Sequence, residues 1–255
     1  MTRDEIKNLP ASVRQRLMNL ADRSGEPFLR VLINYGLERL LYRLSRSRYR
    51  DRFVLKGALL FAVWSELPHR PTIDVDLMSA TTITTAELTS IFSAICATPV
   101  EDDGLTFLPG SVRGEEIRET HAYAGVRLKM LAKLGNAHID LQVDIGFADA
   151  ITPGPVTLEY PSLLGFPAPR LSAYPRETVV AEKLEAAVSL GMQNSRMKDF
   201  YDLWIMAREF EFEGAVLSHA IRNTFDRRKT AIPADEPVVL PPSDGRQYRL
   251  HQRQA

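Results

Sequence analysis

Two aspartates, Asp74 and Asp76, lie two residues apart in the apolar run TIDVDLM, residues 72–78. The run is typical of a β-strand, in which residues i and i+2 point to the same face. Both carboxylates are therefore expected on one surface of a sheet, where they repel each other unless a cation lies between them. A divalent metal ion is the obvious cation. Two solvated aspartates on an edge strand are the alternative.

The composition is typical of a globular protein: 45% of the 255 residues are hydrophobic and 25% are charged. No apolar run is long enough to span a bilayer, and the charged N-terminus does not resemble a secretory signal. The single cysteine, Cys96, excludes an internal disulfide and a cysteine-rich metal site. We therefore expect no membrane partner and a cytoplasmic location.

The hydrophobic pattern predicts a mixed α/β (α+β) protein that ends in helices. Strands are expected at 52–57, at 73–78 and through 105–147. Proline- and glycine-rich segments at 152–155 and 165–169 mark a boundary. We predict a first domain over 1–165, with helices at its N-terminus, and a helical domain over 166–255 whose tail is irregular from about residue 231.

Basic residues are concentrated at the N-terminal end, although the net charge of the whole chain is zero. Residues 1–56 contain 13 Lys and Arg against 6 Asp and Glu. Arginines beside tyrosines suit a phosphate backbone and exposed bases, whereas a solvated helix end is the equally weighted alternative. The densest cluster, a candidate RNA-binding segment over 41–52, contains Arg43, Arg46, Arg48, Arg50 and Arg52.

The segment before Asp74 has the order strand, glycine turn and helix, with the turn at Lys56, Gly57 and Ala58. Such a turn allows backbone N–H groups to approach a polyphosphate. Phosphoryl and nucleotidyl transfer combine a turn of this kind with carboxylates that hold one or two metal ions. The turn and the Asp-x-Asp strand therefore predict nucleotidyl transfer.

A third carboxylate is expected from the segment IDLQVDIGFAD, residues 139–149. Asp144 lies between Val143 and Ile145, where an unpaired charge would be costly, and is the predicted third metal ligand. Asp140 has the same strand parity and is an alternative at the rim. Asp149 is expected past the end of the strand.

Four segments together resemble the AbiEii/AbiGii toxin family, which belongs to the DNA polymerase β superfamily of nucleotidyltransferases and includes the MenT toxins. They are FVLKGALLFAVWSELPHRPTIDVDLM, LQVDIGFAD, AEKLEAAVSLG and RMKDFYDLWIM, in that order. The resemblance covers residues 10–210. The chain departs from the family at Ala58, where the family has Gly or Ser, so only the backbone N–H is left to contact a phosphate there.

The resemblance implies a DNA polymerase β-like core with a mixed sheet, so that the domain over 1–165 is the nucleotidyltransferase-like one. Arg70 and Thr72 match its first motif. Lys183 and Asp199 match the later lysine and aspartate, which gives them a predicted role in catalysis, and Asp202 is expected to support them. The predicted phosphate contacts are Lys56, Gly57, Ala58, Arg70, Thr72, Arg196 and Lys198.

The resemblance also implies a toxin of a toxin–antitoxin or abortive-infection system. Such an enzyme transfers NMP from an NTP to RNA, in the MenT relatives to the tRNA 3′ end, with Mg²⁺ or Mn²⁺ as cofactor. Its cognate antitoxin comes from an adjacent gene.

Two other functions stay open. In the first, the chain is a nucleotidyltransferase whose acceptor is a protein or a small molecule. In the second, it is a non-catalytic module that binds RNA or a partner. Thr72 is expected to share the face of Asp74 and Asp76, so phosphorylation there would place negative charge in the site and silence it.

Overall fold

The computed structural model describes residues 8–65, 72–120, 123–191 and 197–234. Within them the chain divides into two compact units. The first comprises the described residues up to 148 together with 156–173, and the second comprises 149–155 and the described residues from 174 onward. The first unit extends past the boundary predicted between residues 165 and 166, because the strand at 170–173 joins its sheet.

The first unit contains α-helices and short 3-10 turns besides its strands. The helices are α1 (Leu9–Ser24), α2 (Phe28–Arg46), α3 (Phe61–Trp64) and α4 (Thr85–Cys96), and the turns are η2 (Arg50–Arg52), η3 (Ala58–Leu60) and η4 (Pro109–Ser111). Side chains cap two of these helices: Asn8 accepts from the Ala11 N–H, and Thr84 accepts from the Glu87 N–H. α1 ends at Gly25, whose φ of 71° is the left-handed conformation that glycine favours.

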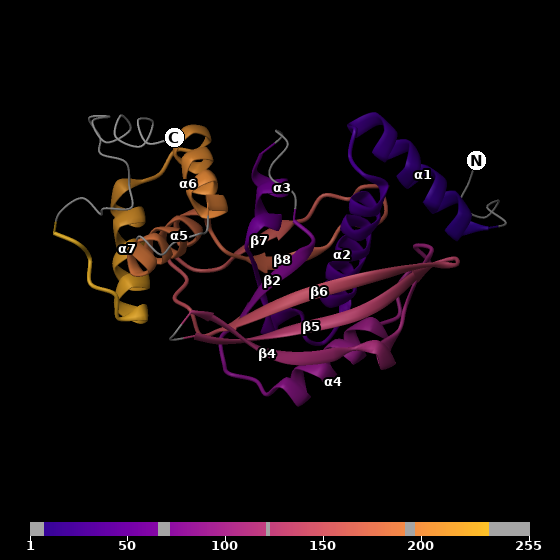
Figure 1. The fold of residues 1–255 in the computed structure, drawn as a ribbon, viewed down its shortest axis with the longest axis horizontal. Coiled ribbons are helices and arrows are strands. Elements are labelled where there is room, and N and C mark those ends of the chain that lie inside the picture. The colour runs from indigo at the N-terminus through magenta and orange to yellow at the C-terminus, as the bar shows by residue number, and fades with distance from the viewer. Residues whose placement is uncertain (1–7, 66–71, 121–122, 192–196, 235–255) are drawn as a thin grey trace, which may run out of the picture. The chain divides into compact units, whose positions relative to one another are not determined.

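The strands of the first unit form one mixed sheet (Figure 1). They are β1 (Val54–Lys56), β2 (Asp74–Ser79), β3 (Leu105–Phe107), β4 (Arg113–Thr120), β5 (Tyr123–Leu134), β6 (Ala137–Phe147), β7 (Val156–Glu159) and β8 (Arg170–Ala173). The order is β3-β5-β6-β2-β1-β8-β7, with β4 paired to β5. β2 runs parallel to β6 and antiparallel to β1. The predicted α/β class with a mixed sheet is confirmed.

The apolar core lies on one face of this sheet. Along β6 the odd-numbered residues from Ile139 to Ile145 are buried. α2 packs on this face so closely that a Cβ on Gly36 would meet Leu141 and Ile139. α4 lies against β4 (Figure 1). The even-numbered residues of β6 therefore point to the opposite face, on which Asp74 and Asp76 also lie.

α2 also carries buried charges, which are paired with one another. Arg39 Nε donates to Asp103 at 3.0 Å, and Arg39 Nη1 donates to Glu38 at 3.1 Å. Glu38 also accepts from the Leu163 N–H at 2.8 Å. A buried charge is tolerated when its hydrogen bonds are satisfied in this way, so the network fixes α2 against two loops.

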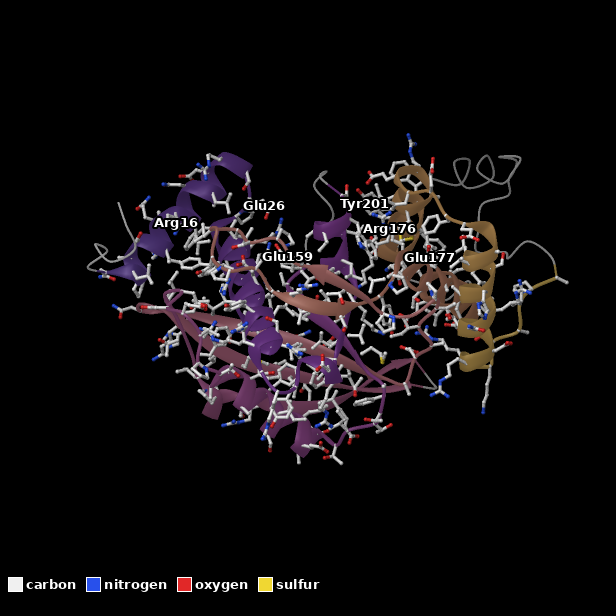
Figure 2. All side chains as sticks on the ribbon, turned by 180° about the vertical axis from the view of Figure 1, so that it is seen from behind. Arg16, Glu26, Glu159, Arg176, Glu177 and Tyr201 are labelled. Carbon is white, nitrogen blue, oxygen red and sulfur yellow. The ribbon has the colours of Figure 1, made fainter. Side chains whose placement is uncertain are left out.

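The second unit is helical, as predicted. It contains α5 (Arg176–Leu190), α6 (Met197–Glu209) and α7 (Gly214–Arg228). Arg176 is the first residue of α5 (Figure 2). Its guanidinium lies 4.0 Å from the ring centroid of Phe210, which follows α6. None of the helices in the described segments has an apolar stretch long enough to cross a bilayer.

Candidate active site

β2 presents its two aspartates as the spacing predicts. Val75 and Leu77 are buried in the core, whereas Asp74 and Asp76, which alternate with them, are only partly buried. The alternation forces both carboxylates to the face of the sheet opposite the apolar core.

Charged residues form a row across five neighbouring strands on this face. Strand pairing places Lys56 opposite Asp76, Asp76 opposite Asp144, Asp144 opposite Arg127, and Arg127 opposite Glu115. Directly opposed residues in a sheet point to the same side, with their Cβ atoms about 5 Å apart. The two central carboxylates therefore lie between a lysine on one side and an arginine on the other.

Gly57 brings the backbone close to one of these carboxylates. Its φ of 75° and ψ of −159° form a conformation that is almost restricted to glycine. A Cβ at this position would lie 1.9 Å from Asp76 Oδ2. The turn between β1 and η3 thus fits directly against Asp76. Lys56 and Ala58 on either side are buried.

Thr72 is bonded to the other aspartate of β2. Its hydroxyl donates to Asp74 Oδ1 at 2.5 Å, from a position just before the strand begins. A hydroxyl that donates to a carboxylate oxygen restricts the rotation of that carboxylate. Thr72 therefore orients Asp74.

Asp144 is held by an arginine that is not among the predicted site residues. Arg127 on β5 donates from Nε to Asp144 Oδ1 at 2.9 Å and from Nη2 to Oδ2 at 2.7 Å. These hydrogen bonds raise the pKa of Arg127 above its usual value, and the charges of Glu115 and Asp74 act in the same direction. The one signal in the sequence was a basic residue that alternates with apolar ones in this strand, and its partner depended on the strand register.

The carboxylates of this face fit a divalent ion in part. Asp74 and Asp76 are a pair of oxygen ligands of the kind that Mg²⁺ and Mn²⁺ prefer. Asp144 has both oxygens bonded to Arg127. No group of three metal-ligating side chains occurs among the residues that the structure describes. Asp140 is exposed on β6, opposite Leu131.

Lys183 and the aspartates predicted to work with it meet in the second unit. Lys183 Nζ on α5 lies 2.7 Å from Asp199 Oδ1 and 2.8 Å from Asp202 Oδ2, both on α6. The exposed fractions of the three side chains are 12%, 10% and 0%. These contacts stabilise the packing of α5 on α6 whatever further role the residues have.

A second buried ion cluster lies in the same unit, around Arg228. Its guanidinium lies 2.8 Å from Glu185, 3.2 Å from Glu182 and 3.2 Å from Asp149. Asp149 follows the end of β6, as predicted, and is part of this cluster. The cluster ties the segment after β6 to α5 and α7.

The basic segment divides into one buried arginine and four exposed ones. Arg43 is buried, donates to both oxygens of Asp103 and lies over the ring of Phe107. Its inclusion in an RNA-binding surface does not agree with this position, because α2 is buried along most of its length and the arginine is enclosed with it. The exposed members are Arg46, Arg48, Arg50 and Arg52.

Of three other predicted phosphate contacts, one lies within the described residues. Lys198 is exposed in the first turn of α6. Arg70 and Arg196 lie outside the described residues, so their predicted roles stay predictions.

Residues 39–254 match the model of the family described as "Nucleotidyl transferase AbiEii toxin, Type IV TA system". The chain belongs to this family. The AbiEii match makes it a nucleotidyltransferase and the toxin of a toxin–antitoxin system, which implies a cognate antitoxin. No curated protein matches the chain.

Two solved structures from Helicobacter pylori are similar to the chain. One is that of the protein JHP933, and the other is described as a candidate nucleotidyltransferase. Each shares 15% identity over 75% of this chain, with a TM-score of 0.45, and the matches cover 72% and 74% of the two proteins.

Proposed function

We propose that this AbiEii-family protein transfers a nucleoside monophosphate from an NTP to a hydroxyl of RNA, with the tRNA 3′ end as the acceptor. In that reaction the hydroxyl loses its proton to solvent and its oxygen bonds to the α-phosphorus of the NTP. The bond from the α-phosphorus to the bridging oxygen of the β-phosphate breaks, and pyrophosphate leaves. The observation that carries the proposal is the pair of carboxylates on β2, Asp74 and Asp76, beside the Gly57 turn.

Asp74 and Asp76 are the residues that would hold Mg²⁺ or Mn²⁺. When bound, such an ion neutralises triphosphate charge and favours ionisation of the attacking hydroxyl. Thr72 orients Asp74, and the Gly57 turn leaves the backbone close to Asp76. Asp144, the predicted third ligand, would have to share its oxygens with Arg127 to bind the same ion.

The residues of the second unit enter the proposal through the family resemblance. Lys183 and Asp199 match the lysine and aspartate of the family motifs, so we include them among the residues required for transfer. Their buried ion pair means that a test of either residue must separate activity from folding.

Exposed arginines support an RNA acceptor. Arg48 donates to the Tyr49 hydroxyl at 2.6 Å, with its guanidinium 4.9 Å from the ring centroid. An arginine beside an accessible tyrosine suits a phosphate and a stacked base. The action of the protein on RNA places it in the cytoplasm in this proposal.

The test is to incubate the purified protein with each of the four α-³²P-labelled NTPs, Mg²⁺ and one acceptor class at a time. Total RNA, lysate protein and small-molecule acceptors are tried separately. We expect the wild-type protein to transfer the label to RNA and the Asp74→Asn variant to transfer none. Label in protein or a small molecule would replace the RNA acceptor. Absence of both NTP binding and transfer would refute an enzymatic role.

A further inference from the structure

Arg127 has a geometry that the predicted site does not account for. It lies on the same sheet face as Asp74 and Asp76, one strand beyond Asp144. Its side chain is 33% exposed, whereas that of Asp144 is 9% exposed. In this contact a buried carboxylate accepts two hydrogen bonds from a partly exposed arginine.

The contact fixes the orientation of the guanidinium. Nε and Nη2 point at the two oxygens of Asp144, in the bidentate arrangement that holds the planar group most firmly. Nη1 makes no hydrogen bond to any of the residues that the structure describes. The free edge of the guanidinium is thus presented in a fixed direction at the face that carries the β2 aspartates.

The charge around this edge suits a phosphate group. The carboxylates of Asp74 and Asp76 repel an oxyanion unless a cation accompanies it, and a metal-bound triphosphate brings that cation. An arginine beside the pair then binds the phosphate oxygens that the ion leaves free. A planar guanidinium matches such oxygens with two parallel hydrogen bonds.

We propose that Arg127 binds a phosphate group of the nucleoside triphosphate, and that Asp144 anchors Arg127 instead of serving as a third metal ligand. The inference rests on the proposed function and adds to it. Arg127 contacts the substrate, whereas Asp144 is a positioning residue. The metal ligands on this face are then Asp74 and Asp76 alone.

The test measures nucleotide binding and metal binding separately. Binding of the four α,β-methylene NTPs, which cannot release pyrophosphate, is followed by calorimetry in Mg²⁺. Arg127→Gln is expected to lower the affinity about 10- to 100-fold, the loss typical of hydrogen bonds to a charged group. Lys129→Gln is the matched control: Lys129 lies two residues along β5 on the same face, 59% exposed and paired with Glu115, and its loss is expected to leave affinity unchanged.

Mn²⁺ binding without nucleotide, followed by electron paramagnetic resonance, tests the role of Asp144. Asp76→Asn is expected to lose Mn²⁺ affinity. Asp144→Asn is expected to keep Mn²⁺ affinity and to weaken nucleotide binding, because its amide no longer grips the guanidinium with two acceptors. A loss of Mn²⁺ affinity in Asp144→Asn as large as in Asp76→Asn would overturn the proposal.

Arg127→Gln leaves Asp144 buried without its counterion, so folding is checked by thermal unfolding. If the variant does not fold, the double variant Arg127→Gln/Asp144→Asn replaces it, because two neutral amides leave no buried charge. The double variant is also expected to bind nucleotide weakly. If wild type binds an NTP and these variants bind it equally well, the inference fails alone. If wild type binds none, the proposed function fails with it.

Discussion

Replacement of Lys183 by methionine separates the structural role of this residue from a catalytic one. Methionine keeps most of the length of the side chain and removes the ammonium. The change leaves Asp199 and Asp202 facing the gap, with Asp202 fully buried. Breaking a buried ion pair by removal of one partner costs about 3–5 kcal/mol, chiefly because the remaining buried charge loses that partner.

That cost is a large part of the 5–15 kcal/mol by which a typical domain is stable, so urea unfolding followed by circular dichroism measures it directly. Arg222→Met removes an exposed cation from α7 of the same unit and is expected to change stability by less than about 0.5 kcal/mol. The double variant Lys183→Met/Asp202→Asn is expected to regain stability, because the amide removes the charge that the first change exposed.

The turnover of wild type and of Lys183→Met is then measured per folded molecule, at a temperature where both are folded. If Lys183 also stabilises the transferring phosphate, Lys183→Met is expected to lose about 100- to 1000-fold in turnover. A destabilised variant with wild-type turnover would make Lys183 a structural residue only. A variant that is neither destabilised nor slowed would refute the burial argument as well.

Three further changes test the first unit. Gly57→Ala is expected to lower the thermal midpoint and abolish transfer, since the Cβ would lie 1.9 Å from Asp76 Oδ2 and the backbone conformation costs about 1–3 kcal/mol. Gly110→Ala, with open space around its Cβ, is the control for unfolding, and equal thermal midpoints of the two variants would contradict the close approach of Gly57 to Asp76. Thr72→Ser is expected to stay active in NTP turnover and Thr72→Glu to be silent, because Thr72 donates to Asp74; an active Glu variant would show that the hydroxyl does not matter there. Charge reversal at Arg46, Arg48 and Arg50 of the basic segment is expected to weaken RNA binding and flatten its salt dependence. Filter binding at several salt concentrations measures both effects, and an unchanged RNA affinity at low salt would make the segment an ordinary helix end.

Local features were predictable because each depends on a few neighbouring residues. The spacing of Asp74 and Asp76 alone fixes their common face once the strand is recognised. The glycine turn follows from the order of strand, glycine and helix.

Long-range contacts were not predictable in this way. Arg127 meets Asp144 only because β5 and β6 pair in one register, 17 residues apart in sequence. Lys183 was predicted to have a role in catalysis. Its ion pair with Asp199 was not predictable, because it depends on how α5 packs on α6. Arg43 differs from its exposed neighbours only because the loop that carries Asp103 folds against α2.

The position of the β2 aspartates within the sheet has a consequence for how this enzyme can diversify. β2 is paired on both sides, by β1 and β6, and β6 is paired by β2 and β5. The amide protons of these inner strands are expected to exchange slowly with solvent, because their hydrogen bonds break only when the sheet itself unfolds. Mutations that shift these strands are therefore expected to cost more stability than mutations at the edge strands β4 and β7. New acceptor preferences are therefore expected to arise at the edges and loops, around a pair of carboxylates that stays in place.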